Sequence, residues 1–352
     1  MGIRILKISN LKNFDPNAAA SKDSGIFGLP FTVEEATLVL IPVPWEVTTS
    51  YGGGTSKGPQ AILQASKQVD LFDAELGGFF TAGIAMLEEP LQIRQWNDIA
   101  RQYAQVIIEA SSLMDDTSLE TIIQEVNSYS RHLNQYVYQE TKRFLVQDKW
   151  VGIVGGDHSV SLGAIQACLE KHPHMGILHF DAHADLRKAF EGFTYSHASI
   201  MYNVIASTSL SKLVQVGIRD LCQEEFELIQ QNNNRISTFF DYSLSEQKLK
   251  GITWDTICDE IILQLPHEVY ISFDIDGLDP RFCPHTGTPV PGGLEFNEAL
   301  HLIKRVVCSG RQIIGFDLNE VSPGHSSSEW DANVGARLLY KLCGWMIKSM
   351  SS

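Results

Sequence analysis

The stretch GILHFDAHADLRKAF, residues 176–190, joins a short apolar run to three ionisable side chains at alternate positions: Asp181, His183 and Asp185. Alternate residues of an extended chain point to the same face, so these three side chains can converge. Charged groups at the end of a buried strand lose hydration and need a compensating partner. The stretch therefore predicts a buried strand that delivers an acid, an imidazole and a second acid to a binding site.

Similar apolar runs recur along the chain and alternate with amphipathic helical patterns. Strands are expected at 37–43, 150–155, 175–180, 212–218, 236–240, 268–275 and 311–318. Helices are expected around 58–68, 97–110, 131–147, 159–171, 222–232, 253–264, 295–307 and 328–348. This alternation predicts an α/β fold with a mainly parallel sheet covered by helices on both faces. We expect an irregular N-terminal arm over 1–30, a single domain over 31–352, and a polar surface insertion at 111–130.

The composition excludes several classes of partner. The chain has 352 residues and a formal net charge of −15, which argues against nucleic acid or an anionic membrane surface as a partner. No stretch approaches the roughly 20 apolar residues of a membrane span, and the first residues do not read as a secretory signal. The six cysteines form no Cys-x-x-Cys pair, which favours free thiols in the cytoplasm.

Two further expected strands are also followed by a group of ionisable side chains. GGDHS supplies Asp157 and His158 after a glycine turn, and SFDIDGLDP supplies Asp274 and Asp276. In a parallel sheet, ligands bind beyond the carboxyl ends of the strands, so the three segments are expected to meet there. So many carboxylates repel one another unless a cation is present. Carboxylate-rich sets with few imidazoles favour Mn²⁺ or Mg²⁺ over Zn²⁺, and a pair of such ions can activate water for hydrolysis.

The motifs GGDHS, DAHAD and SFDIDGLDP, in this order, resemble the metal motifs of the ureohydrolases. This family includes arginases, agmatinases, guanidinobutyrases, formimidoylglutamases and guanidine hydrolases. The resemblance runs from about Ile41 to the C-terminus and implies a three-layer α/β/α sandwich and a homo-oligomer, a trimer or hexamer. It also implies two divalent ions per chain, Mn²⁺ first and Ni²⁺ as the alternative. The implied ligands are His158, Asp181, His183, Asp185, Asp274 and Asp276, with Asp181 and Asp274 as bridges.

The resemblance implies a reaction as well: hydrolysis of a guanidino C–N bond, which gives urea and an amine. Glu320, just past the 311–318 strand, matches the acid that binds the guanidinium group. His197 and Asp185 are the expected catalytic residues, with His197 as the proton shuttle. The loop 44–59 lies near the site mouth in this family, and the side chains expected to line a narrow pocket there are Trp45, Thr49, Tyr51 and Trp330.

Substrate choice stays open at this point. Arginine is disfavoured because Arg187 and Cys222 stand where arginases carry groups that hold its α-amino acid end. An agmatine-like amine leads, and guanidine, guanidinobutyrate and formiminoglutamate are the alternatives. A zinc deacetylase-like enzyme and a non-catalytic metal-binding relative are hypotheses of a different functional class. The number of bound metal ions per chain distinguishes them: two for the ureohydrolase, one for the deacetylase and none for the degenerate relative. The remaining histidines, His179 among them, are expected to be surface or packing residues.

Overall fold

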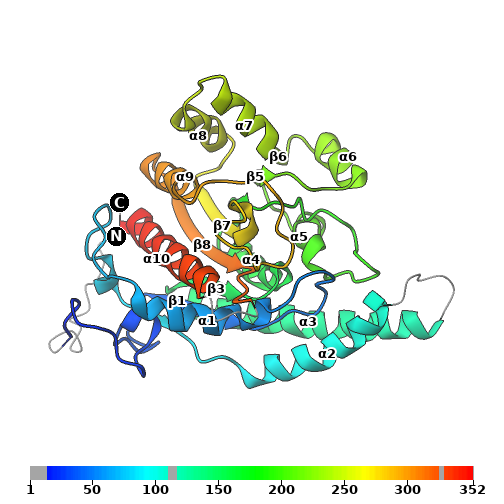
Figure 1. Cartoon of the computed structure of the whole chain (residues 1–352), viewed down its shortest axis with the longest axis horizontal. Helices are drawn as coiled ribbons and strands as arrows, with labels where there is room; N and C mark the ends of the chain where they lie inside the picture. The colour runs from blue at the N-terminus through cyan, green and yellow to red at the C-terminus, as the bar shows by residue number, and fades with distance from the viewer. Residues whose placement is uncertain (1–13, 110–116, 325–328, 352) are drawn as a thin grey trace.

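The computed structural model describes residues 14–109, 117–324 and 329–351, and its centre is a sheet of eight parallel strands (Figure 1). Their order across the sheet is β2-β1-β3-β8-β7-β4-β5-β6. This confirms the α/β fold with a parallel sheet. The strands are β1 (Leu38–Val43), β2 (Ile84–Met86), β3 (Trp150–Gly155), β4 (Gly176–Phe180), β5 (Lys212–Ile218), β6 (Ile236–Phe240), β7 (Glu268–Asp274) and β8 (Gln312–Asn319).

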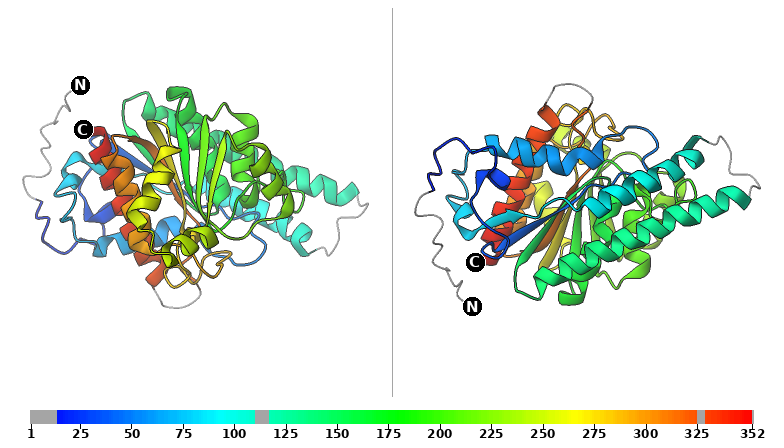
Figure 2. Two further views of the ribbon diagram at one scale, coloured as in Figure 1. Left: turned by 90° about the horizontal axis from the view of Figure 1, so that it is seen from above. Right: turned by 90° about the horizontal axis from the view of Figure 1, so that it is seen from below.

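Helices cover both faces of the sheet, which gives the three layers visible in Figure 2. Neighbouring residues of a strand serve opposite faces: Leu40 belongs to one buried core and Ile41 to the other. A strand buried on both sides needs such continuous apolar character. One layer holds α1 (Gly58–Ala65), α7 (Asp241–Leu249), α8 (Trp254–Leu263), α9 (Phe296–Cys308) and α10 (Trp330–Ser351). The other holds α2 (Leu91–Glu109), α3 (Thr117–Leu145), α4 (Leu162–Lys171), α5 (Ile200–Ser207) and α6 (Gln223–Gln231).

The polar segment 111–130 differs from the expectation of a surface insertion. Residues 117–130 form the first half of α3, and 111–116 lie outside the described residues. Val126 of this segment is fully buried, and its neighbour Asn127 uses its side-chain oxygen to accept a hydrogen bond from the backbone N–H of Thr194. Asn127 and Ser130 are polar yet buried, which hid the helical pattern. Together, α2 and α3 form a pair that extends beyond the sheet (Figures 1 and 2).

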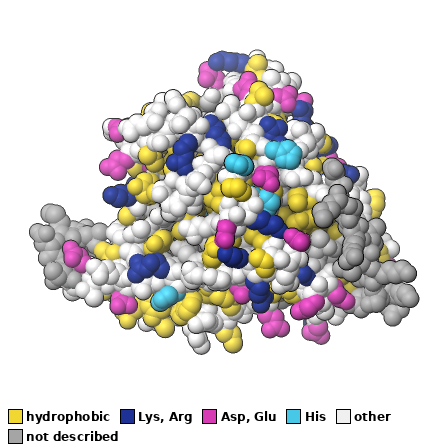
Figure 3. All heavy atoms as spheres, turned by 180° about the vertical axis from the view of Figure 1, so that it is seen from behind, with side chains coloured by type: hydrophobic (Ala, Val, Ile, Leu, Met, Phe, Trp, Pro, Cys, Tyr) yellow, Lys and Arg dark blue, Asp and Glu magenta, His cyan; other side chains and the backbone are white. Residues whose placement is uncertain are grey.

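The described part of the N-terminal arm packs on the domain. Ile26, Phe27 and Leu29 are buried, and the ring of Phe27 lies 4.8 Å from that of Tyr340 on α10. Residues 1–13 of the expected arm lie outside the described residues, and the division at residue 30 stays a prediction. In the described ranges, no helix combines the length and apolar character that crossing a membrane requires. On the face shown in Figure 3, basic and acidic side chains are interspersed.

The strand order decides where the polar segments meet. β3, β8, β7 and β4 are consecutive in the sheet, although they are far apart along the chain. Because all four run in the same direction, their carboxyl ends share one edge. The chain leaves these ends at the residues that the sequence analysis selected, which brings them to one place.

Candidate metal centre and active site

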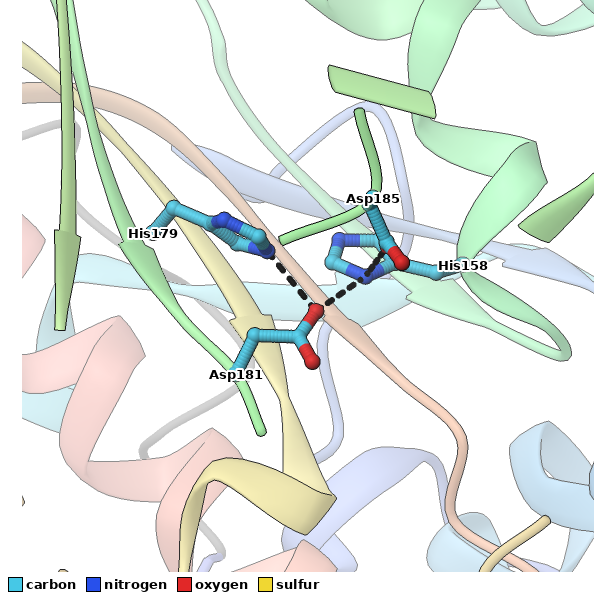
Figure 4. Close-up of side chains that lie close together, drawn as sticks. All are labelled: His158, His179, Asp181 and Asp185. Carbon is cyan, nitrogen blue, oxygen red and sulfur yellow. Dashed lines mark hydrogen bonds and ion pairs between the residues drawn. The ribbon is translucent and has the colours of Figure 1, made fainter. Parts of the chain in front are cut away.

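One set of donor atoms surrounds the imidazole of His158, which follows β3. Its Nδ1 lies 3.1 Å from Asp181 Oδ2, 3.2 Å from Asp185 Oδ2 and 3.4 Å from Asp274 Oδ2. Figure 4 shows His158 with Asp181 and Asp185, which follow β4. All four side chains are buried. Ligands at about 2.1 Å from a tetrahedral ion are about 3.4 Å apart, so this spacing fits a single ion.

A second set of donor atoms adjoins the first and shares Asp181. His183 Nδ1 lies 3.4 Å from Asp181 Oδ1 and 3.1 Å from Asp276 Oδ2. Asp181 therefore turns one oxygen toward each set, as a bridging carboxylate does. Asp274 faces His158 with Oδ2, while its Oδ1 accepts a hydrogen bond from the backbone N–H of Asp276 at 2.9 Å. All six predicted ligands thus lie in two adjoining sets.

The electrostatics of the site favour a bound cation. Burial, together with the charge of Asp181, raises the pKa of Asp185 to about 6. Burial and the nearby Asp276 and Asp181 also raise the pKa of Asp274 well above its usual range. Carboxylates in such a setting resist ionisation unless a cation compensates them. The inward-facing oxygen and nitrogen donors therefore fit a pair of divalent ions.

Two site residues have a positive backbone φ angle, which residues other than glycine rarely adopt. Asp185 has φ 55° and Glu320 has φ 61°. Hydrogen bonds hold both: Asp185 O accepts from Tyr202 N at 3.0 Å, while Glu320 N donates to Gly156 O at 2.8 Å. Thr286 Oγ1 also donates to Glu320 O at 2.7 Å. Strain of this kind persists only where surrounding contacts enforce it, and it is concentrated at functional sites.

His197 is held by a residue that the sequence analysis did not select. Its backbone N–H donates to Thr48 Oγ1 at 3.2 Å, and its Nδ1 lies 3.1 Å from the same oxygen. Burial lowers the pKa of His197 to about 3, so the free ring is neutral. Arg101 on α2 fixes Thr48 from both sides, because its Nη1 donates to Val47 O at 2.9 Å and to Thr49 O at 2.6 Å.

The four residues expected at the site mouth lie in different environments. Trp45 and Thr49 are buried, whereas Tyr51 is 84% exposed and Trp330 is 48% exposed. Trp45 packs in the core beneath the loop 44–59, so it supports the loop rather than lining its surface. The carboxylate of Glu46 accepts hydrogen bonds from backbone N–H groups further along this loop. Substrate contact by any of the four stays a prediction.

His179 was expected to be a surface or packing residue, but it contacts a carboxylate of the site. It is fully buried, and its Nε2 lies 2.8 Å from Asp181 Oδ2, on the opposite side from His158 (Figure 4). His179 is two residues before Asp181 in a strand, so the period-two pattern that selected Asp181, His183 and Asp185 extends back to it. That extension was the signal that could have found it.

Comparisons with known proteins agree with this geometry. The Arginase family model matches residues 36–344. The N(1)-aminopropylagmatine ureohydrolase of Thermus thermophilus is 32% identical over 88% of this chain and 90% of its own length. The agmatinase of Bacillus subtilis is 29% identical over 90% of this chain and 93% of its own. The structure of proclavaminate amidino hydrolase from Streptomyces clavuligerus superposes with a TM-score of 0.69 at 25% identity, covering 94% of this chain and 99% of that one. The chain belongs to the Arginase family.

Proposed function

We propose that the chain is a ureohydrolase with a two-metal centre, which hydrolyses the guanidino C–N bond of a small substrate to urea and an amine. The observation that carries this proposal is the pair of donor sets that share Asp181, at the same sheet edge as Glu320. Two relatives that align over most of this chain are named ureohydrolase and agmatinase, which supports the reaction class. A deacetylase with one zinc would leave the second set, around His183, without a role.

The proposed ligands are the six residues of the two sets, and their oxygen-rich character favours Mn²⁺, with Ni²⁺ as the alternative. When bound, the two ions lower the pKa of water and so provide a nucleophile at neutral pH. The guanidinium carbon is a weak electrophile because its charge is delocalised. The residues around the centre must therefore hold the substrate close and supply a proton to the leaving group.

Glu320 is the proposed guanidinium-binding residue. Its Oε2 is buried and has no hydrogen-bond partner among the described residues. A carboxylate with one free, dehydrated oxygen is suited to the planar, cationic guanidinium group. Burial, with the charges of Asp274 and Asp157, raises the pKa of Glu320 well above its usual range. A cationic substrate would relieve this unfavourable charge, which favours binding at this carboxylate.

His197 is the proposed proton shuttle. Thr48 occupies its Nδ1, which leaves Nε2 as the atom that gains and loses the proton. The low pKa of the half-buried ring means that a proton taken up at Nε2 is readily passed on to the departing amine nitrogen. With Nε2 as the nitrogen that titrates, Nδ1 keeps its hydrogen in both protonation states and donates it to Thr48 Oγ1, so the ring keeps its orientation through the cycle.

Agmatine-like amines, including aminopropyl derivatives, are the proposed substrates, and guanidinobutyrate, guanidine and formiminoglutamate are the alternatives. The net charge of −15 is compatible with a cationic substrate and supports neither nucleic acid nor an anionic membrane as a partner. Tyr51 and Trp330 are the proposed exposed residues at the site mouth, and Trp45 and Thr49 are the proposed buried ones. A cytoplasmic homo-trimer or homo-hexamer completes the proposal.

Urea release from protein loaded with Mn²⁺ or Ni²⁺ tests the function. The substrates are agmatine, N(1)-aminopropylagmatine, arginine, guanidinobutyrate and guanidine, with formamide followed from formiminoglutamate. We expect two ions per chain and the largest kcat/KM on an agmatine-type amine. A different substrate far ahead of the rest would replace the proposed substrate but keep the reaction. Two bound ions with no turnover on any of the six would contradict the reaction class.

A further inference from the structure

Behind the carboxylate of Asp181, a line of hydrogen bonds crosses three neighbouring strands. His179 on β4, Gln215 on β5 and Thr238 on β6 are direct partners in the register of the sheet. Thr238 Oγ1 donates to Gln215 Oε1 at 2.9 Å, and Gln215 Nε2 lies 3.1 Å from His179 Nδ1. His179 Nε2 then lies 2.8 Å from Asp181 Oδ2. Gln215 and His179 are fully buried, so water does not compete for these bonds.

The backbone carbonyl of Ala184 fixes the orientation of the Gln215 amide. Gln215 Nε2 lies 2.8 Å from Ala184 O, which can only accept a hydrogen bond. With the amide turned over, Gln215 Oε1 would face that carbonyl oxygen and two acceptors would repel each other. The amide nitrogen therefore stands between Ala184 O and His179 Nδ1, and its two hydrogens serve one acceptor each.

This orientation decides the tautomer of the His179 imidazole. Because Gln215 donates to Nδ1, the neutral imidazole carries its hydrogen on Nε2. That hydrogen points at Asp181 Oδ2. His179 lies close enough to His158, Asp181 and Asp185 to be counted with them as a metal-binding group. However, a nitrogen that donates a hydrogen bond has no lone pair for a metal ion, so His179 orients a ligand instead of being one.

We propose that Gln215 is the positioning residue of the metal centre. Its amide makes His179 a hydrogen-bond donor to Asp181, the carboxylate shared by the two donor sets. The same amide holds the carbonyl of Ala184, which lies between the ligands His183 and Asp185. One buried side chain thus controls the shared carboxylate and the turn that carries two further ligands. The inference rests on the proposed two-metal function and goes beyond it by naming the residue that shapes the site.

The isosteric variant Gln215→Glu tests the proposal, because a carboxylate has no hydrogen to give to Ala184 O or to His179 Nδ1. The apo-protein is dialysed against chelator-buffered Mn²⁺ and the bound metal per chain is measured. We expect the affinity for at least one ion to fall by about 10- to 100-fold, as when other groups that orient metal ligands are lost. If Gln215→Glu does not fold, the second variant is Gln215→Met, which keeps the length of the side chain but has no N–H group to donate to Ala184 O or His179 Nδ1.

Thr238→Val is the matched control. It removes only the outermost hydrogen bond and leaves the Ala184 contact to fix the amide. We expect its metal affinity to change by less than about fivefold. Thermal unfolding of each apo-variant separates lost folding from lost binding. Unchanged affinity for both ions in the folded Gln215 variants would overturn the proposal.

The tautomer of His179 can be measured without metal and without turnover. In ¹⁵N-histidine-labelled apo-protein, we expect an unprotonated Nδ1 and a protonated Nε2 for the signal that disappears in His179→Gln. The opposite tautomer, with the hydrogen on Nδ1 and none on Nε2, would overturn the proposal. It would also be overturned if His179→Gln lost one of the two ions while Gln215→Glu kept both. If the unmodified protein binds no divalent ion at all, the proposed two-metal function fails, whereas the NMR spectrum still decides the assignment of His179.

Discussion

Glu320 is hydrogen-bonded through one carboxylate oxygen to the backbone of His158: Oε1 accepts from the His158 N–H at 2.9 Å. The other oxygen, Oε2, is buried without a partner among the described residues. A Cβ atom at Gly287 would come within 3.3 Å of Oε2, so glycine keeps the space beside it open. A direct hydrogen bond therefore fixes Glu320, the proposed guanidinium-binding acid, relative to His158 of the first donor set.

Glu320→Gln removes the proposed charge partner of the guanidinium while Oε1 can still accept from His158. We expect kcat/KM to fall by about 30- to 5,000-fold, since loss of one partner of a buried charge pair costs about 2–5 kcal/mol. Folding is expected to be at least as stable as before, because burial already disfavours this charge. Steady-state urea release and thermal unfolding are the measurements. A kcat/KM within twofold of the unmodified protein would exclude guanidinium binding by Glu320.

His197→Asn removes the proposed proton shuttle from a position outside both donor sets. We expect kcat to fall by about 10²- to 10⁴-fold, the usual contribution of general acid–base catalysis, with little change in KM. Metal content should stay at two ions per chain. Loss of an ion in this variant would show that His197 acts through the metal centre, against the proposed role.

Thr48→Val keeps the shape of the side chain but removes the hydroxyl that His197 contacts. We expect kcat to fall by about fivefold, the value of one ordinary hydrogen bond, at constant KM. Thr48→Ser should restore most of the rate. The matched control is Thr55→Val in the same loop 44–59, because the buried hydroxyl of Thr55 has no partner among the described residues. Equal loss in both valine variants would mean that the loop as a whole, and not the Thr48 contact, supports catalysis.

Metal binding should stabilise the protein more as the pH rises from 5 to about 7.5. The pKa of Asp185 in the folded protein is raised to about 6, so the folded apo-protein binds more protons than the unfolded chain between about pH 4 and 6. The protonated carboxyl group of Asp185 therefore contributes to the stability of the folded apo-protein below pH 4, and this contribution is lost as the pH rises past 6. Metal ions need the ionised carboxylates and bind more tightly over the same range. Thermal unfolding with Mn²⁺ and with chelator measures the difference, and a constant gap between the two would contradict the expectation.

The sequence pattern predicted which side chains would gather at one edge of the sheet, because their spacing is a property of extended chain; their role as metal ligands stays a prediction. Asp181, His183 and Asp185 alternate after an apolar run, and the parallel sheet carries them to one edge. His179 obeys the same alternation, yet it lies inside the apolar run, where an imidazole is usually interpreted as packing. Its partner Gln215 is 36 residues further along the chain, and only the strand order reveals the contact.

Loop conformation was beyond what the sequence could predict. Thr48 and Thr49 are adjacent and identical, and the choice of which one faces His197 depends on Arg101, more than 50 residues away on α2. Short elements were missed for a related reason. β2 has three residues and α5 has eight, too few to show a clear hydrophobic period.

The place of β8 in the sheet has a consequence for how the site is assembled. β8 is the last strand along the chain, yet it lies between β3 and β7 near the middle of the sheet. During synthesis, the segments that carry His158 and Asp274 emerge before the strand that separates them. The sheet cannot close across its centre until β8 is inserted, and contacts so distant in sequence form late in folding. The carboxylates that follow the adjacent strands β4 and β7 can meet without β8, but the imidazole of His158 joins them only when β8 is in place, so the first donor set is a product of completed folding.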